Sequence, residues 1–233
     1  MRSNRDLPKP TALGQKLPNL ALALLAGALV QSWSSGRLDL LMAQHFHPLV
    51  LVSGLLLGCL AVLNELSGAG QISQRPRAAL LLGLASVFII VVPPQPSFSL
   101  LVANRDAAVL EGLAAGFALP PEQRSLVDWV RILRNSPDPS VFAGQAVRVQ
   151  GFVRYRNDTA PSLARLVVRC CLADATAAEL TVSWPQAQPA PQRDQWLDVR
   201  GVMGHRQGKN GKEALVIPDQ IRSIPRPRHP LSN

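Results

Sequence analysis

Three stretches without a formal charge restrict what the first hundred residues of this chain can become. They begin at Leu17, Leu40 and Ala78 and run for 20, 25 and 27 residues. A helix that crosses the hydrocarbon core of a bilayer needs ~20 mainly apolar residues. The third helix is expected to stop at the Pro93–Pro94 pair, because proline cannot continue a helix. We therefore predict a transmembrane anchor over residues 1–98, with three spans at about 17–36, 46–66 and 78–94.

Basic residues in the short loops predict how the spans are oriented. The N-terminal tail carries four Lys or Arg residues, the first loop carries only Arg37, and the second loop carries Arg75 and Arg77. Because cytoplasmic loops are enriched in Lys and Arg, this pattern predicts a cytoplasmic N-terminus in the plasma membrane. Three spans then make the C-terminal domain extracytoplasmic. No Ala-x-Ala-like cleavage site follows the first apolar run, which favours a retained anchor over a signal peptide.

Two local patterns mark the second predicted span. Gly54 and Gly58 are four residues apart, a spacing of small residues that allows two helices to approach closely. His45 and His47 precede the helix-starting Pro48. These histidines are either a metal entrance at the membrane interface or simply polar residues at the end of the span.

The rest of the chain has the polar density of a water-soluble domain. Residues 99–233 hold 17 Lys or Arg and 12 Asp or Glu, against 7 and 3 in residues 1–98. We expect residues 99–139 to form a connector with an amphipathic portion from Leu100 to Leu119. A helix capped by Ser125 is predicted to run to Leu133, because its apolar residues follow the helical period.

Beyond residue 140 the apolar period changes to two, which is typical of β-strands. Turn-forming residues separate the runs, and Gly151 and Gly201 lie where a small barrel needs sharp bends. The chain is therefore expected to be an α+β membrane protein, in which three N-terminal transmembrane helices precede a small OB-like antiparallel β-barrel at 140–233 with a basic, Pro-rich tail. The five predicted strands are Val147–Tyr155, Leu163–Leu172, Glu179–Trp184, Trp196–Met203 and an interrupted strand formed by Ala214–Ile217 and Ile221–Ile224.

The segment from Arg169 to Asp174 is the strongest candidate for a functional motif, because it contains the adjacent residues Cys170 and Cys171. Strand alternation would point the two thiols to opposite faces. Two interpretations remain open. Either both cysteines pack structurally, or one thiolate, near Asp174 and with its pKa lowered by Arg169, binds a soft metal or acts in redox chemistry. Of the two, Cys171 is expected to be the more exposed, since it lies closer to the turn at Asp174.

Several classes of function are not supported by the sequence. It contains no P-loop, dinucleotide fingerprint, nucleophile elbow or zincin helix, so we expect neither an enzyme nor a cofactor. An OB-like domain could suggest nucleic acid. Single-stranded nucleic acid needs aromatic stacking platforms, and Leu163–Leu172 contains no aromatic residue. We therefore expect no nucleic-acid partner.

Three segments give the chain a resemblance to a known family. His47-Pro48 opens the second span, Gly144–Val153 reads GQAVRVQGFV, and Arg169–Ala175 reads RCCLADA. Over most of its length the chain is similar to the permease-subunit proteins, which have a conserved C-terminal domain of unknown function and pair with a multi-spanning permease. Some members carry a His- and Cys-rich loop between the second and third spans, whereas Ser67–Arg77 here has neither residue.

The resemblance implies a partner more than a reaction. We expect a non-catalytic accessory membrane subunit, whose partners are a multi-spanning permease and the lipid bilayer. The alternative is a stand-alone, membrane-tethered metal- or thiol-binding module. Co-purification of a permease would favour the first, and stoichiometric bound metal would favour the second.

Overall fold

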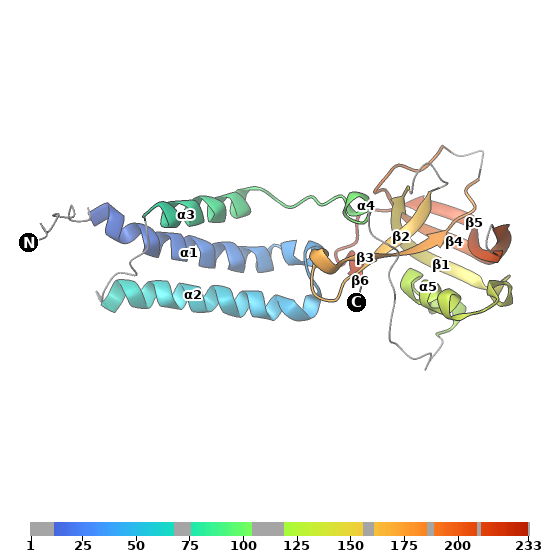
Figure 1. The fold of residues 1–233 in the computed structure, drawn as a ribbon, viewed down its shortest axis with the longest axis horizontal. Helices are drawn as coiled ribbons and strands as arrows, with labels where there is room; N and C mark the ends of the chain where they lie inside the picture. The colour runs from blue at the N-terminus through green and yellow to red at the C-terminus, as the bar shows by residue number, and fades with distance from the viewer. Residues whose placement is uncertain are drawn as a thin grey trace, which may run out of the picture. The chain divides into compact units, whose positions relative to one another are not determined.

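The computed structural model describes residues 12–67, 76–103, 119–155, 161–185, 189–208 and 211–232 (Figure 1). The chain divides into two compact units, each considered by itself. The first comprises Met1–Leu38 and Gln44–Pro94, and the second comprises Asp39–Ala43 and Gln95–Asn233. Most of the predicted amphipathic connector, at 104–118, lies outside the described residues.

Three helices form the first unit: α1 at Ala12–Ser34, α2 at His47–Ser67 and α3 at Pro76–Val91. The three helices predicted from the uncharged stretches are confirmed. By length and composition, α1 and α2 could each cross a membrane, whereas α3 is a shorter apolar helix. The 16 residues of α3 correspond to ~24 Å of helix at 1.5 Å per residue, which is less than the ~30 Å of a typical hydrocarbon core.

Helices α1 and α2 pack closely at the predicted small-residue pattern. A Cβ atom added to Gly54 would lie 3.1 Å from the Cβ atom of Leu29 and 3.1 Å from Cγ2 of Val30. One added to Gly58 would lie 3.7 Å from the Cβ atom of Ala26. The prediction of an interhelical contact at this pattern is confirmed.

Arg37, which follows α1, caps the end of α3. Its Nη1 atom donates to the carbonyl oxygens of Ile89 at 2.6 Å and Ile90 at 3.0 Å. The last carbonyls of a helix lack intrahelical partners and carry the negative end of its dipole, so a guanidinium there is stabilising. The C-terminal end of α3 therefore lies beside the segment that follows α1.

A six-stranded sheet forms the centre of the second unit. Its order is β3-β2-β1-β4-β5, with β6 paired to β2. All pairs are antiparallel except β2 with β6, which is parallel. The strands are β1 at Ala146–Arg154, β2 at Ser162–Val167, β3 at Thr176–Thr181, β4 at Trp196–Gly208, β5 at Gly211–Ser223 and β6 at Leu231–Ser232.

The predicted closed barrel is wrong, because the sheet stays open between β3 and β5. A single bridge joins Val182 to Val216, and the Ser183 N–H donates to the Val216 carbonyl at 2.8 Å. The chain then reaches Pro185, with Pro189 and Pro191 beyond it. Proline has no N–H to donate to a ladder, so these three positions cannot extend the pairing.

Two strand predictions need smaller corrections. The strand expected at Leu163–Leu172 ends at Val167, which leaves the cysteine pair outside it. The fifth strand is continuous rather than broken at Pro218. The register shifts between Arg200 and Gly201, and Pro218 is tolerated because β5 is an edge strand. Only glycine fits opposite it, since a Cβ atom on Gly201 would lie 2.0 Å from the Ile217 carbonyl oxygen.

Two helices outside the sheet complete the core of this unit. Helix α5 at Leu126–Asn135 begins at Ser125, the predicted cap, which forms a capping box with Asp128. It buries Trp129 completely in the main apolar cluster. Helix α4 at Phe98–Leu101 buries Phe98 against the rings of Phe152 and Trp196. Short 3₁₀ turns occur at Arg37–Leu40, Gln44–Phe46, Pro121–Gln123, Pro139–Phe142 and Leu172–Asp174.

Candidate functional site

The cysteine pair lies in a tight turn that follows β2. The Asp174 carboxylate accepts the backbone N–H of Arg169 at 2.9 Å and that of Cys170 at 2.8 Å. These two bonds pull the chain back on itself immediately after the strand. A short carboxylate that satisfies nearby backbone N–H groups competes with strand pairing, which explains why β2 ends early.

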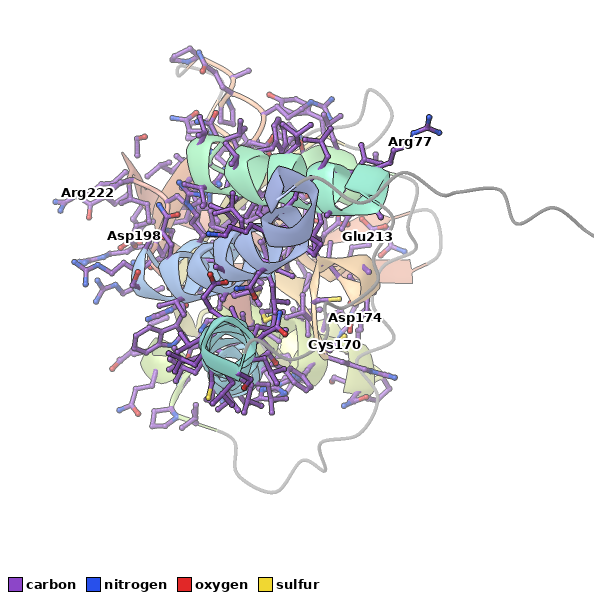
Figure 2. All side chains as sticks on the ribbon, turned by 90° about the vertical axis from the view of Figure 1, so that its left-hand side faces the viewer. Arg77, Cys170, Asp174, Asp198, Glu213 and Arg222 are labelled. Carbon is purple, nitrogen blue, oxygen red and sulfur yellow. The ribbon has the colours of Figure 1, made fainter. Side chains whose placement is uncertain are left out.

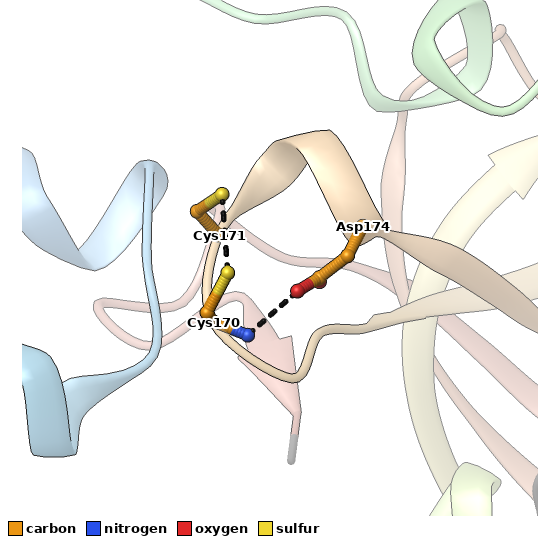
Figure 3. A group of neighbouring side chains, drawn as sticks. All are labelled: Cys170, Cys171 and Asp174. Carbon is orange, nitrogen blue, oxygen red and sulfur yellow. Dashed lines mark hydrogen bonds between the residues drawn. The ribbon is translucent and has the colours of Figure 1, made fainter.

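In this turn the two thiols converge, contrary to what strand alternation predicted. The Sγ atoms of Cys170 and Cys171 are 3.5 Å apart (Figure 3). Cys170 is exposed and Cys171 is half-buried, so neither thiol is a core residue and the expected order of exposure was wrong. In Figure 2, Cys170 and Asp174 lie close together and well apart from Asp198 and Arg222 of the same unit.

A second stretch of chain, distant in sequence, holds the backbone of the pair. The Ala43 N–H donates to the Cys170 carbonyl at 2.9 Å, and the Leu172 N–H donates to the Leu41 carbonyl at 2.9 Å. Met42 and Cys171 form an antiparallel bridge between these bonds. Residues 41–43 thus pair with the cysteine turn through one antiparallel bridge and its two flanking hydrogen bonds. Nothing in the sequence of this segment pointed to that role.

The electrostatics of the turn suppress the thiolate form of Cys170. Its hydrogen bond to the Asp174 carboxylate, reinforced by Cys171, raises the pKa of Cys170 to about 12. Burial raises the pKa of Asp174, but the hydrogen bonds that it accepts from Cys170 and Arg169 outweigh that effect and lower the pKa overall. The expectation that Arg169 would lower the pKa of a cysteine is therefore wrong for Cys170.

The three side chains nevertheless form a potential cation site. The two sulfur atoms and a carboxylate oxygen all lie within 4.8 Å of one another. Two thiolates and a carboxylate are suitable donors for a soft or borderline ion such as Zn²⁺, with a fourth position left open. Binding would have to displace the thiol protons, so the affinity of such a site would rise with pH.

The two membrane-side histidines do not join a comparable cluster. His45 lies in the 3₁₀ turn Gln44–Phe46 and packs on Phe46, with ring centroids 4.3 Å apart. His47 is the first residue of α2. Within the described part of the chain, the one group of three or more potential metal ligands is that of Cys170, Cys171 and Asp174.

Comparison with known proteins identifies the C-terminal part of the chain. Residues 122–231 match the family model of the DUF1980 C-terminal domain. The matched stretch contains α5, the sheet and the cysteine turn, and it excludes α1–α4. No curated protein matches the chain. No solved structure matches it either.

Proposed function

We propose that the chain is a non-catalytic accessory subunit of a multi-spanning permease, anchored in the plasma membrane by α1, α2 and α3. The observation that carries the proposal is the outward surface of α2 and α3. Large apolar side chains there are about half exposed or more, including Leu56 at 60%, Leu81 at 67% and Phe88 at 64%. Such a surface fits lipid or another apolar helix.

The helices themselves offer no polar path for a solute. Residues 20–34, 49–64 and 78–91 contain no Asp, Glu, Lys or Arg. Transport sites in membranes are usually marked by ionisable residues that face the interior of the bundle. A chain with an apolar anchor of this kind is better suited to accompany a pathway formed by a partner. The resemblance of RCCLADA at Arg169–Ala175 to permease-subunit proteins supports the same partner.

The pairing of residues 41–43 with residues 170–172 supports three spans and an extracytoplasmic β domain. Both segments must lie on one side of a bilayer, because backbone groups cannot pair across it. Helices α2 and α3 separate the two segments in sequence, so if α2 crosses, α3 crosses as well. Combined with the basic N-terminal tail, this favours a cytoplasmic N-terminus and an extracytoplasmic β domain.

Affinity purification of the tagged full-length chain from membranes in a mild detergent tests the proposal. We expect a multi-spanning permease to co-purify with the unsubstituted chain. Either Leu56→Arg or Phe88→Arg should abolish recovery of the permease, since each substitution puts a charge on an exposed apolar face. Leu100→Arg, in the second unit, is the control and should leave recovery unchanged. Recovery of no multi-spanning protein would reject the proposal.

A second candidate function rests on the cysteine turn. We propose as the alternative a stand-alone, membrane-tethered module that binds a soft metal through Cys170 and Cys171. The test is titration of the purified reduced protein with Zn²⁺ and with Cu⁺. One ion per chain, lost in Cys170→Ser and Cys171→Ser but kept in Cys59→Ser, would support it. Equal binding by all three variants would show that the turn is not the site.

A further inference from the structure

A cavity of about 260 Å³ opens in the second unit where β1 separates from β2. Their pairing covers only Phe152–Arg154 of β1, and β6 takes the free edge of β2 from Leu166 onward. The cavity lies beside the start of α5. Its lining includes three arginines and a single acidic residue: Arg124, Arg148, Arg165 and Glu122.

Two of these arginines are surrounded by neutral partners. Arg124 is only 8% exposed. It donates to the Leu119 carbonyl at 2.7 Å and to Oε1 of Gln145 at 2.9 Å, and it stacks 4.6 Å from the ring centroid of Trp129. Within the described part of the chain, no carboxylate contacts it. Its buried positive charge is thus hydrogen-bonded but not neutralised.

Arg165, another residue that lines the cavity, is partly buried and also has neutral partners. It donates to the His229 carbonyl at 2.8 Å and to Oγ of Ser232 at 3.3 Å, and it lies 5.3 Å from the ring centroid of Trp196. Among the described residues, Arg165 also has no carboxylate partner. The contrast is Arg154, which is buried and forms an ion pair with Glu179. The Arg154 guanidinium is therefore neutralised by a carboxylate, whereas those of Arg124 and Arg165 are hydrogen-bonded to neutral groups.

Other donors face the same space. The Ser125 hydroxyl and the Asp128 carboxylate satisfy each other's backbone N–H groups at the start of α5. The next two N–H groups, of Leu126 and Val127, have no intrahelical partner, as at any helix start. Arg148 contributes a third guanidinium, which lies 3.6 Å from Asp198. The carboxamide of Gln150, another lining residue, donates to the same carboxylate.

We infer that this cavity is a binding site for a small phosphate-type oxyanion. Guanidinium groups bind such anions through paired N–H donors, and a helix start favours negative charge. An oxyanion would neutralise Arg124 and Arg165 together, which no described carboxylate does. The inference is independent of the permease and metal proposals, because it uses neither the membrane helices nor the cysteine turn.

Isothermal titration calorimetry of the full-length protein with inorganic phosphate, in a chloride buffer and a non-ionic detergent, tests the inference. We expect saturable binding of one phosphate per chain. Arg148→Gln should weaken it at least ~10-fold, the effect of losing one charge-assisted hydrogen bond. Arg200→Gln is the matched control and should bind normally: Arg200 is the cross-strand partner of Arg148 and also lies near Asp198, but it does not line the cavity.

Three further titrations complete the design. Arg165→Gln should also weaken phosphate binding, and the exposed Arg148 keeps the test valid if loss of the Arg165 contact to Trp196 disturbs folding. A titration with glycerol phosphate tests whether the site prefers an esterified headgroup or the free ion. The preferred form is the one, glycerol phosphate or inorganic phosphate, that binds more tightly. Acetate should bind more weakly than either. Absence of saturable phosphate binding, or equal losses in Arg148→Gln and Arg200→Gln, would overturn the inference.

Discussion

At the scale of single residues, Asp174 has two effects on the cysteine turn. Its carboxylate accepts the N–H groups of Arg169 and Cys170 and so shapes the turn. The same charge stabilises the protonated thiol of Cys170 and opposes its ionisation. An exposed cysteine with a raised pKa reacts slowly and binds metal weakly, since the thiolate is the nucleophile and the metal ligand. A cation or a change at Asp174 would be needed to make it reactive.

This arrangement predicts how Asp174→Asn changes thiol reactivity. The substitution removes the charge, so the pKa of Cys170 should fall from about 12 toward its ordinary value of 9.0. The thiolate population at about pH 9 then rises, and alkylation by iodoacetamide, followed per cysteine by mass spectrometry, should be at least ~10-fold faster. Glu213→Gln, which removes an exposed carboxylate elsewhere, should have no effect. An unchanged rate in Asp174→Asn would show that the carboxylate does not control the thiol.

At the scale of elements, Gly54 of α2 and Gly27 of α1 differ in how closely other atoms approach them. A side chain at Gly54 would collide with Leu29 and Val30 of α1, whereas one at Gly27 would meet nothing within 4 Å. The spacing of Gly54 and Gly58 was readable in the sequence. Which surface of α1 they meet was not, because it depends on how the two helices are rotated.

We predict that Gly54→Leu loosens the α1–α2 contact and Gly27→Leu does not. Overpacking of a close contact costs about 1–3 kcal/mol. In detergent, Gly54→Leu should lower the melting temperature and reduce disulfide cross-linking between cysteines introduced at Ala26 and Gly58, where a Cβ atom on Gly58 would lie 3.7 Å from that of Ala26. Gly27→Leu should behave like the unsubstituted protein in both measurements. Equal effects of the two substitutions would contradict the packing described here.

Helix α4 supplies a second comparison, because it packs on the sheet although it precedes the matched domain family. The Asp194 carboxylate accepts the Ser99 N–H at 2.8 Å, and Phe98 is 1% exposed. Phe98→Ala should therefore lower the free energy of unfolding of the β domain by about 3–5 kcal/mol. Leu100→Ala, at a position 67% exposed in the same helix, should change it by less than about 0.5 kcal/mol. Urea unfolding followed by tryptophan fluorescence measures both values.

At the scale of the whole molecule, the proposed topology has a consequence that fusions can test. A periplasmic-type reporter, active only outside the cytoplasm, should be active when fused after Asn233 and inactive when fused at Gly70. Deletion of α3 should reverse the C-terminal result, because the β domain would then follow an even number of spans. An inactive reporter on the intact C-terminal fusion would mean that α3 does not cross the membrane.

The sequence by itself determined the helices, most of the strands and the cap of α5, because these features depend on local period, charge and capping. It also singled out Cys170, Cys171 and Asp174, since a pair of adjacent cysteines can be read directly from the sequence. It could not show that the thiols converge, because their direction depends on backbone bonds between Asp174 and the start of the turn.

Only the tertiary structure decided the features that join distant residues. Residues 41–43 hold the cysteine turn, and Phe98 and Trp129 complete the core, through contacts that no local pattern encodes. The same holds for the open edge between β3 and β5, where prolines interrupt the ladder that a barrel requires. Arg124, Arg148 and Arg165 are 17 to 41 residues apart in the chain. They share one cavity because β1 separates from β2, and a charge pattern in sequence carries no information about that separation.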